Sequence, residues 1–91
     1  MKPTQPNTIR RFRLWDAVRQ QPIRWRYYSN PVRAANGALK EAHWSRPGAV
    51  IEVYDITRGN TLAIYHKRPS GLDTSHSRTF KEWLRLHGGV R

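Results

Sequence analysis

With 91 residues, 37% of them hydrophobic, the chain is long enough for one small domain with a thin core. The absence of cysteine excludes disulfide bonds and thiolate zinc sites, and no run of residues is apolar enough to cross a membrane. Seventeen Lys and Arg residues against six Asp and Glu residues give a formal net charge of +11, which is typical of a protein that binds a polyanion such as nucleic acid.

The two ends of the chain differ in composition from its middle. Residues 1–8 contain two prolines and mostly polar side chains, so we expect a disordered tail there. We place a single α+β domain at residues 9–87 and a flexible C-terminus at residues 88–91.

The segment 9–15 is the most ambiguous part of the domain. As a strand it would place Phe12 and Leu14 on one side and arginines on the other, whereas as a helix its apolar residues would scatter around the axis. We favour a strand that pairs with the segment 22–28, and a short helix over residues 12–20 is the alternative.

The segment 22–28 is the clearest strand, because aromatic and β-branched residues alternate with arginines. We expect Ile23, Trp25 and Tyr27 to face the core. The opposite side would present polar groups to solvent: Arg24, Arg26 and Tyr28.

A helix is expected to follow, with Asn30 as its N-cap and Pro31 in its first position. Pro47-Gly48 would end this element. Gly37 lowers its stability by about 1 kcal/mol relative to alanine, and either a close packing contact or a lack of selection would explain its presence. The core stripe is expected to be Val32, Ala35, Leu39 and Ala42, and a second side carries Arg33, Gly37, Lys40 and Trp44.

Residues 49–67 are typical of a β-hairpin around the turn 57–60. In the tighter register Tyr54 lies opposite Tyr65. The core side would carry Ile51, Val53, Leu62 and Ile64, and the other side Glu52, Tyr54, Ala63, Tyr65 and Lys67.

Residues 68–77 are expected to form a loop, and residues 79–87 a final helix. Thr79 and Glu82 have the spacing of a capping box. An apolar stripe at helical spacing would cover the core with Phe80, Trp83, Leu84 and His87. The predicted order is therefore β-β-α-β-β-α, an antiparallel sheet with two helices packed on one face.

The function that we expect is non-enzymatic nucleic-acid binding in the cytoplasm, with arginines on phosphates and tyrosines stacked on bases. The sequence does not distinguish DNA from RNA, or a duplex from a single strand. No cofactor or metal site is expected, because the histidines and carboxylates lack ligand spacing. The candidate binding residues are Arg10, Arg11, Arg13, Arg24, Arg26, Tyr28, Arg33, Lys40, Arg46, Tyr54, Tyr65 and Lys67.

The tract from Asn30 to Lys67 joins a helix to a Y-D-x-x-x-G-N hairpin that ends in basic residues. This order resembles small phage, prophage and mobile-element accessory proteins, including some anti-CRISPR proteins, and the arm-binding domains of tyrosine recombinases. The resemblance covers under half of the chain. It implies one alternative function, an inhibitor that docks its basic face on an acidic or nucleic-acid-binding groove of a host protein.

Two further possibilities follow from the residues themselves. A metal-free ribonuclease toxin would use a histidine, His66 or the nearby His76, as general acid or base, with Lys and Arg on the phosphate. A homodimer would form if either segment 22–28 or segment 61–67 were an open sheet edge.

Overall fold

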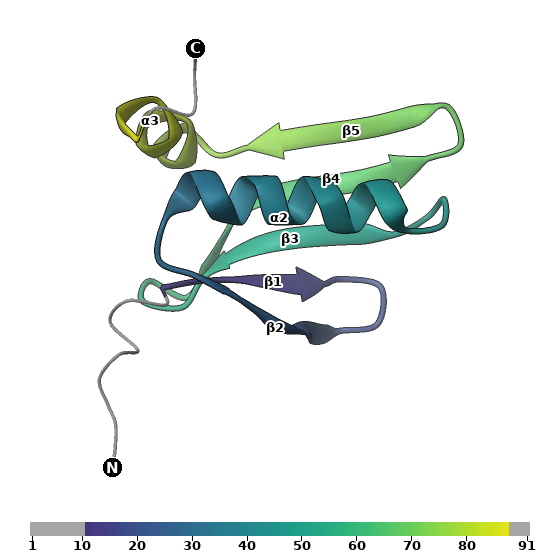
Figure 1. The fold of residues 1–91 in the computed structure, drawn as a ribbon, viewed down its shortest axis with the longest axis horizontal. Coiled ribbons are helices and arrows are strands. Elements are labelled where there is room, and N and C mark those ends of the chain that lie inside the picture. Colours follow the sequence, from purple (N-terminus) through teal and green to yellow (C-terminus); the bar gives the residue numbers. More distant parts are fainter. Residues whose placement is uncertain (1–10, 88–91) are drawn as a thin grey trace.

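The computed structural model describes residues 11–87, with the backbone alone at positions 24 and 25. Five antiparallel strands in this range form one sheet in the order β2-β1-β3-β4-β5, and two helices pack on one face of it (Figure 1). The expected α+β class is therefore confirmed. The elements are β1 (Phe12–Asp16), β2 (Gln21–Tyr28), α2 (Pro31–Trp44), β3 (Val50–Asp55), β4 (Asn60–Arg68), β5 (Gly71–His76) and α3 (Arg78–Leu86).

The helices cover the sheet unequally. α2 lies along the sheet, whereas α3 lies beyond the end of β5, beside the start of α2 (Figure 1). The opposite face of the sheet, which we call the open face, has no helix of the described residues upon it. The expected tails at 1–8 and 88–91, Arg10, and the side chains of Arg24 and Trp25 lie outside what the structure describes. Neither described helix is long and apolar enough to cross a membrane.

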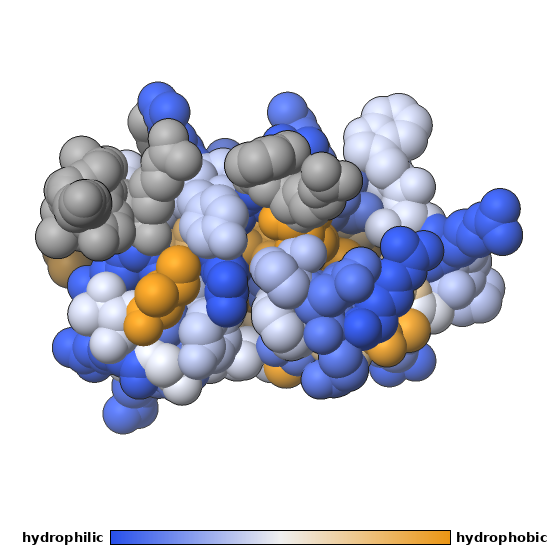
Figure 2. All heavy atoms as spheres, turned by 90° about the horizontal axis from the view of Figure 1, so that it is seen from below, coloured by the Kyte–Doolittle hydropathy of each residue, from blue (hydrophilic) through white to orange (hydrophobic). Residues whose placement is uncertain are grey.

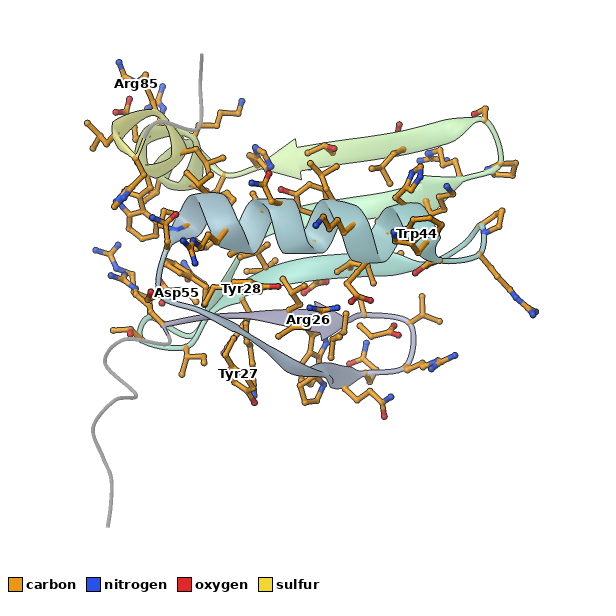
Figure 3. The ribbon with its side chains drawn as sticks, viewed as in Figure 1. Arg26, Tyr27, Tyr28, Trp44, Asp55 and Arg85 are labelled. Carbon is orange, nitrogen blue, oxygen red and sulfur yellow. The ribbon has the colours of Figure 1, made fainter. Side chains whose placement is uncertain are left out.

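β1 confirms the strand expected near residues 9–15 over its described part, and the alternative helix is wrong. β1 pairs with β2, but the register shifts between Arg13 and Trp15, so β2 carries extra residues there. Phe12 lies opposite Tyr28, and Arg13 lies opposite Tyr27. The expected sides of the last β2 residues are therefore wrong, because Tyr28 packs against the core and Tyr27 points away from α2 (Figure 3).

α2 begins as expected, since the Asn30 side chain accepts a hydrogen bond from the Val32 backbone N–H at 2.7 Å. The side that it buries is rotated from the expected one, and Leu39 is 39% exposed. The small size of alanine lets the helix axis lie close to the strands, and tight interior packing favours this approach. The buried residues of the helix are Pro31, Ala34, Ala35, Ala38 and Ala42.

The β3–β4 hairpin forms, but its expected register is wrong. Asp55 pairs with Asn60 across a four-residue turn, and a bulge at Leu62 then shifts the pairing, so that Ile51 lies opposite Tyr65. An odd shift in register exchanges the two sides of a strand. The bulge therefore turns Ala63, Tyr65 and Lys67 toward the helices, and Ile64 and His66 toward the open face.

The expected loop at residues 68–77 is wrong, because β5 lies within it and pairs with β4. β5 is a polar edge strand of which only Leu72 and His76 are half-buried, so it lacks the apolar alternation that indicates a strand. β4 is consequently an internal strand. Of the two candidate edges, the segment 22–28 is one, and the segment 61–67 is not.

α3 covers the core as expected, with Phe80 fully buried and Trp83 and Leu84 packed beside it. The helix begins earlier than expected, because the Ser77 hydroxyl oxygen, and not Thr79, accepts the hydrogen bond from the Phe80 backbone N–H at 3.1 Å. His87 is exposed, so the expectation that it belongs to the apolar stripe is wrong.

Asp55 is the one charged side chain that is fully buried among the described residues. The Arg11 guanidinium donates to both of its carboxylate oxygens, each at 3.0 Å, and the backbone N–H groups of Thr57 and Arg58 donate to one of them. Burial alone would raise the pKa of Asp55, but these hydrogen bonds and the Arg11 charge outweigh it and hold the pKa below its usual value. Asp55 is therefore a charged junction between the start of β1 and the β3–β4 turn.

Replacing Asp55 by asparagine should lower the free energy of unfolding by about 2–4 kcal/mol, because the half-buried Arg11 loses its counter-charge. Urea denaturation monitored by tryptophan fluorescence measures the change. Asp73→Asn is the matched control, since it removes an exposed pair with Arg68 that is worth less than about 1 kcal/mol. Equal losses in the two variants would show that Asp55 is not a structural junction.

Candidate nucleic-acid interface

The outer side of α2 gathers cations and one tryptophan. Arg33, Lys40 and Trp44 follow one another at spacings of seven and four residues, which places them on the same side of a helix. All three are exposed, and Trp44 is 82% exposed. A tryptophan this exposed contributes almost nothing to the core, so its ring is free to contact a partner.

A groove lies beside this row, between α2 and the edge strand β2. We call it the β2–α2 groove; its volume is about 230 Å³. Figure 3 shows Arg26 and Tyr28 beside the helix, on the β2 side of the groove. The groove joins four of the candidate residues from two separate segments of the chain, and its complete lining is Arg26, Tyr28, Arg33, Asn36, Gly37 and Lys40.

Only one carboxylate comes near this groove, and it is already neutralised. The Arg26 Nε atom lies 2.9 Å from a carboxylate oxygen of Glu41, in an exposed ion pair. This pair holds the Arg26 guanidinium beside α2. It leaves Arg33 and Lys40 as cations that form no ion pair within residues 11–87.

Gly37 shapes the groove, because a Cβ atom at this position would lie 2.3 Å from the Tyr28 hydroxyl oxygen. That separation is far inside van der Waals contact. Of the two explanations for a glycine in the middle of the helix, the structure supports close packing. Gly37 gives the tyrosine ring its place against α2.

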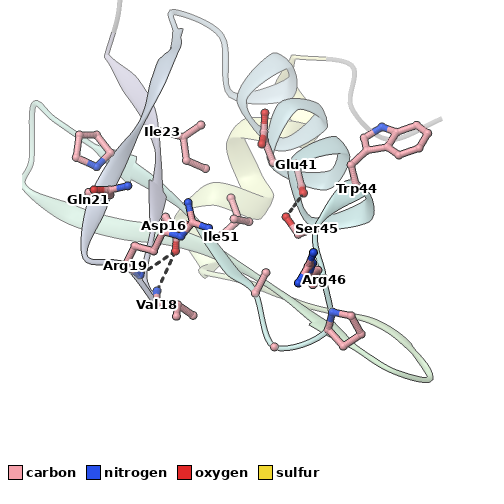
Figure 4. A pocket seen from close by; sticks show the side chains of 14 residues that line it. Asp16, Val18, Arg19, Gln21, Ile23, Glu41, Trp44, Ser45, Arg46 and Ile51 are labelled. Atoms are coloured by element: carbon pink, nitrogen blue, oxygen red, sulfur yellow. Dashed lines mark hydrogen bonds and ion pairs between the residues drawn. The ribbon is translucent and has the colours of Figure 1, made fainter.

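A larger cleft of about 640 Å³ opens where α2 ends (Figure 4). Glu41 and Trp44 line its helix side, Arg46 its far rim, and Asp16 and Arg19 the β1–β2 turn. The Asp16 carboxylate accepts from the backbone N–H groups of its own turn, at 3.0 Å each. The cleft therefore continues the outer side of α2 toward a further candidate residue, Arg46.

Seen from below, along the β2 edge, hydrophilic side chains cover much of the visible surface, and the apolar side chains form separate patches (Figure 2). This surface differs from the broad apolar face that obligate partners bury. Its character suits a polar, charged partner.

The remaining candidate residues do not join the groove. Arg11 is engaged by Asp55, and the Lys67 ammonium donates to the His43 carbonyl oxygen at 3.1 Å. Arg13 and Tyr54 lie together on the open face. Tyr65 is 1% exposed, so its assignment as a stacking residue is wrong, and the cause is the bulge in β4.

Tyr65 instead forms a buried pair with His76, whose Nε2 atom lies 2.7 Å from the hydroxyl oxygen. Burial raises the pKa of Tyr65 well above its usual value, so the hydroxyl keeps its proton. Burial, and then the charge of Lys81, lower the pKa of His76. His76 faces the helices, whereas His66 faces the open side of the sheet, so the two histidines of the ribonuclease alternative do not meet in one site.

Sequence reasoning missed Trp44 as a candidate binding residue, although the signal was present. Its position on the same helical side as Arg33 and Lys40 is visible in the sequence, but only the structure shows that this side is exposed. It also missed Trp15 and Glu52, which lie beside Arg13 and Tyr54. Their proximity depends on the pairing of β1 with β3, which no local pattern indicates.

Comparisons of the chain with protein-family models, with curated proteins and with solved structures find no match. Functional inference therefore rests on the residues and their geometry.

Replacing Gly37 by alanine tests the groove geometry through Tyr28. In a Tyr28→Ala background the change should stabilise the protein by about 1 kcal/mol, which is the difference in helix propensity. With Tyr28 present, the displaced ring should cancel or reverse that gain. A double-mutant cycle by urea denaturation measures the difference, and equal effects in both backgrounds would contradict the contact.

The pH dependence of stability tests the half-buried imidazole of His76. Because the pKa of His76 is lower in the folded than in the unfolded protein, the unfolded state takes up the proton first as the pH falls below about 6.5. The free energy of unfolding should therefore decrease between about pH 7 and pH 5. His76→Gln should flatten this decrease and His43→Gln, an exposed control, should not; the same slope in all three proteins would exclude His76 as its source.

Proposed function

We propose that this protein is a non-enzymatic, cytoplasmic nucleic-acid-binding module that holds the phosphate backbone along the outer side of α2. The observation that carries the proposal is the gathering of Arg26, Arg33 and Lys40 around the β2–α2 groove, with Arg46 in the adjoining cleft. Phosphate oxygens are the natural ligands of such a row of cations.

The distribution of the carboxylates supports this proposal. Five of the six acidic side chains each form an ion pair with an arginine. The sixth, Glu52, is on the open face and accepts from the Thr61 hydroxyl at 3.0 Å. Among the described residues, the outer side of α2 consequently has no free carboxylate to repel a phosphate, which favours a positive field there.

Trp44 would add stacking to this electrostatic binding. A base stacked on an aromatic side chain contributes about 1–3 kcal/mol to binding, whichever of the bases it is. Trp44 lines the same cleft as Arg46 and follows Lys40 by one helical turn, so phosphates and a base could be engaged together. An exposed ring favours a single strand, in which bases are free to stack.

Fluorescence anisotropy with duplex DNA, single-stranded DNA and RNA of matched length, across a salt series, tests the proposal. Arg33→Gln combined with Lys40→Gln should reduce the slope of log affinity against log salt by about 1.4 on a single strand or about 1.8 on a duplex. Glutamine preserves helix propensity, so the fold should be retained.

The matched control is Arg78→Gln combined with Lys81→Gln, which removes the same charge from exposed positions on α3. This pair should leave the slope unchanged. Equal effects of the two pairs would contradict a site on α2. Weak binding to all three nucleic acids, lost near physiological salt, would overturn the function and favour an acidic protein partner.

A further inference from the structure

The open face of the sheet contains a pocket that the basic side of α2 does not explain. It has a volume of about 300 Å³ and is lined by Arg13 and Trp15 of β1, Glu52 and Tyr54 of β3, and Thr61 of β4. This volume is at the lower end of the range for small-molecule sites, so it suits one small planar group. We call it the open-face pocket.

We propose that the open-face pocket binds one guanine base of a single-stranded nucleic acid, with Glu52 accepting from the base, Arg13 donating to it, and the aromatic rings stacking on it. The polymer form of this proposal rests on the proposed nucleic-acid binding. The pocket itself is tested separately, with mononucleotides.

Glu52 is the first observation behind the proposal. Among the acidic residues, it alone has no cation of the described side chains within ion-pair distance. The Thr61 hydroxyl donates to one of its oxygens at 3.0 Å, and the other oxygen has no hydrogen bond from the described residues. A free carboxylate repels phosphate but accepts hydrogen bonds from N–H groups of a base.

The second observation concerns Arg13. Its guanidinium is held by aromatic rings and not by a carboxylate of the described residues. Its central carbon lies 5.6 Å from the centroid of the Trp15 ring and 5.7 Å from that of Tyr54, within cation–π distance of both. Its Nε atom is buried and has no hydrogen-bond partner in the part of the chain that the structure describes. A buried donor without an acceptor is rare in proteins, and an acceptor atom on a bound ligand would satisfy it once the side chains that cover it move aside.

These two groups offer an acceptor and a donor side by side, and guanine offers the complement. Its N1–H and 2-amino groups donate, which suits Glu52, while O6 and N7 accept, which suits Arg13. Uracil has a single N–H donor and adenine has only its amino group, so neither base can donate to a carboxylate from two adjacent groups as guanine does. The base edge must be unpaired to enter the pocket, so the target is a single strand.

The direct test is titration of the full chain with GMP, IMP, AMP and CMP, observed through the indole N–H signals in ¹H–¹⁵N NMR, with Trp15→Phe used for assignment. GMP should shift the Trp15 signal at the lowest concentration. IMP lacks the 2-amino group and should bind at least about fivefold more weakly, since a good bidentate contact discriminates by that much or more. Equal shifts with all four nucleotides, or no shift, would overturn the proposal.

The polymer test compares a uridine oligonucleotide with the same strand carrying one central guanosine. The guanosine strand should bind at least about fivefold more tightly, and Glu52→Gln should abolish this preference. Glu82→Gln, the same change in charge on α3, should retain it. Thr61→Val removes the hydroxyl that positions Glu52 and should weaken the preference, which provides a second variant if Glu52→Gln does not fold.

The outcomes separate the two proposals. Tight binding of both strands without preference would overturn the guanine pocket and leave the proposed function standing. Selective binding of GMP without binding of either strand would overturn the proposed function and leave the pocket standing.

Discussion

The buried ion pair between Asp55 and Arg11 is the interaction on which the sheet depends most. Asp55 closes the β3–β4 turn through backbone N–H groups, and Arg11 holds the beginning of β1 to it. The guanidinium also lies 4.8 Å from the centroid of the Trp83 ring, so the same residue attaches α3. Such a pair pays a large desolvation cost, which only this dense set of hydrogen bonds offsets.

Four of the other five carboxylates also form ion pairs with arginines, and these pairs contribute less to stability. Each exposed pair, such as Arg26 with Glu41, stabilises the fold little but fixes the position of an arginine. Because these carboxylates are already paired with arginines, the surplus cations on α2 face solvent without counter-charges from the described residues. A polyanion would relieve the resulting self-repulsion, and this links the architecture to the proposed function.

Local patterns in the sequence were sufficient for the fold class and for part of the candidate interface. Asn30, Pro31 and the alternation in residues 50–55 are strong local signals, so α2 and β3 were predicted within a residue or two. The spacing of Arg33, Lys40 and Trp44 likewise predicted that these residues share one side of the helix. Helix periodicity survives in the structure because α2 is regular along its whole length.

The failures have physical causes in the strands. β2 and β4 each contain an irregularity, and a single extra residue is enough to exchange the sides of everything beyond it. Tyr65 and Tyr28 were misplaced for this reason, and β5 was missed because an edge strand needs few apolar residues. The Arg11–Asp55 pair and the open-face pocket join residues about forty positions apart, and a single sequence gives no signal of such distant contacts.

The bulge at Leu62 decides which side of the sheet every later residue of β4 faces. If the pairing of Tyr54 with Thr61 continued without a bulge, Val53 would lie opposite Leu62 and Ile51 opposite Ile64, and the rest of β4 would turn over. Tyr65 would then leave the core and Ile64 would enter it, with no substitution at either position. The pairing at this one position, as much as the identity of the residues, therefore decides which side chains β4 presents to solvent.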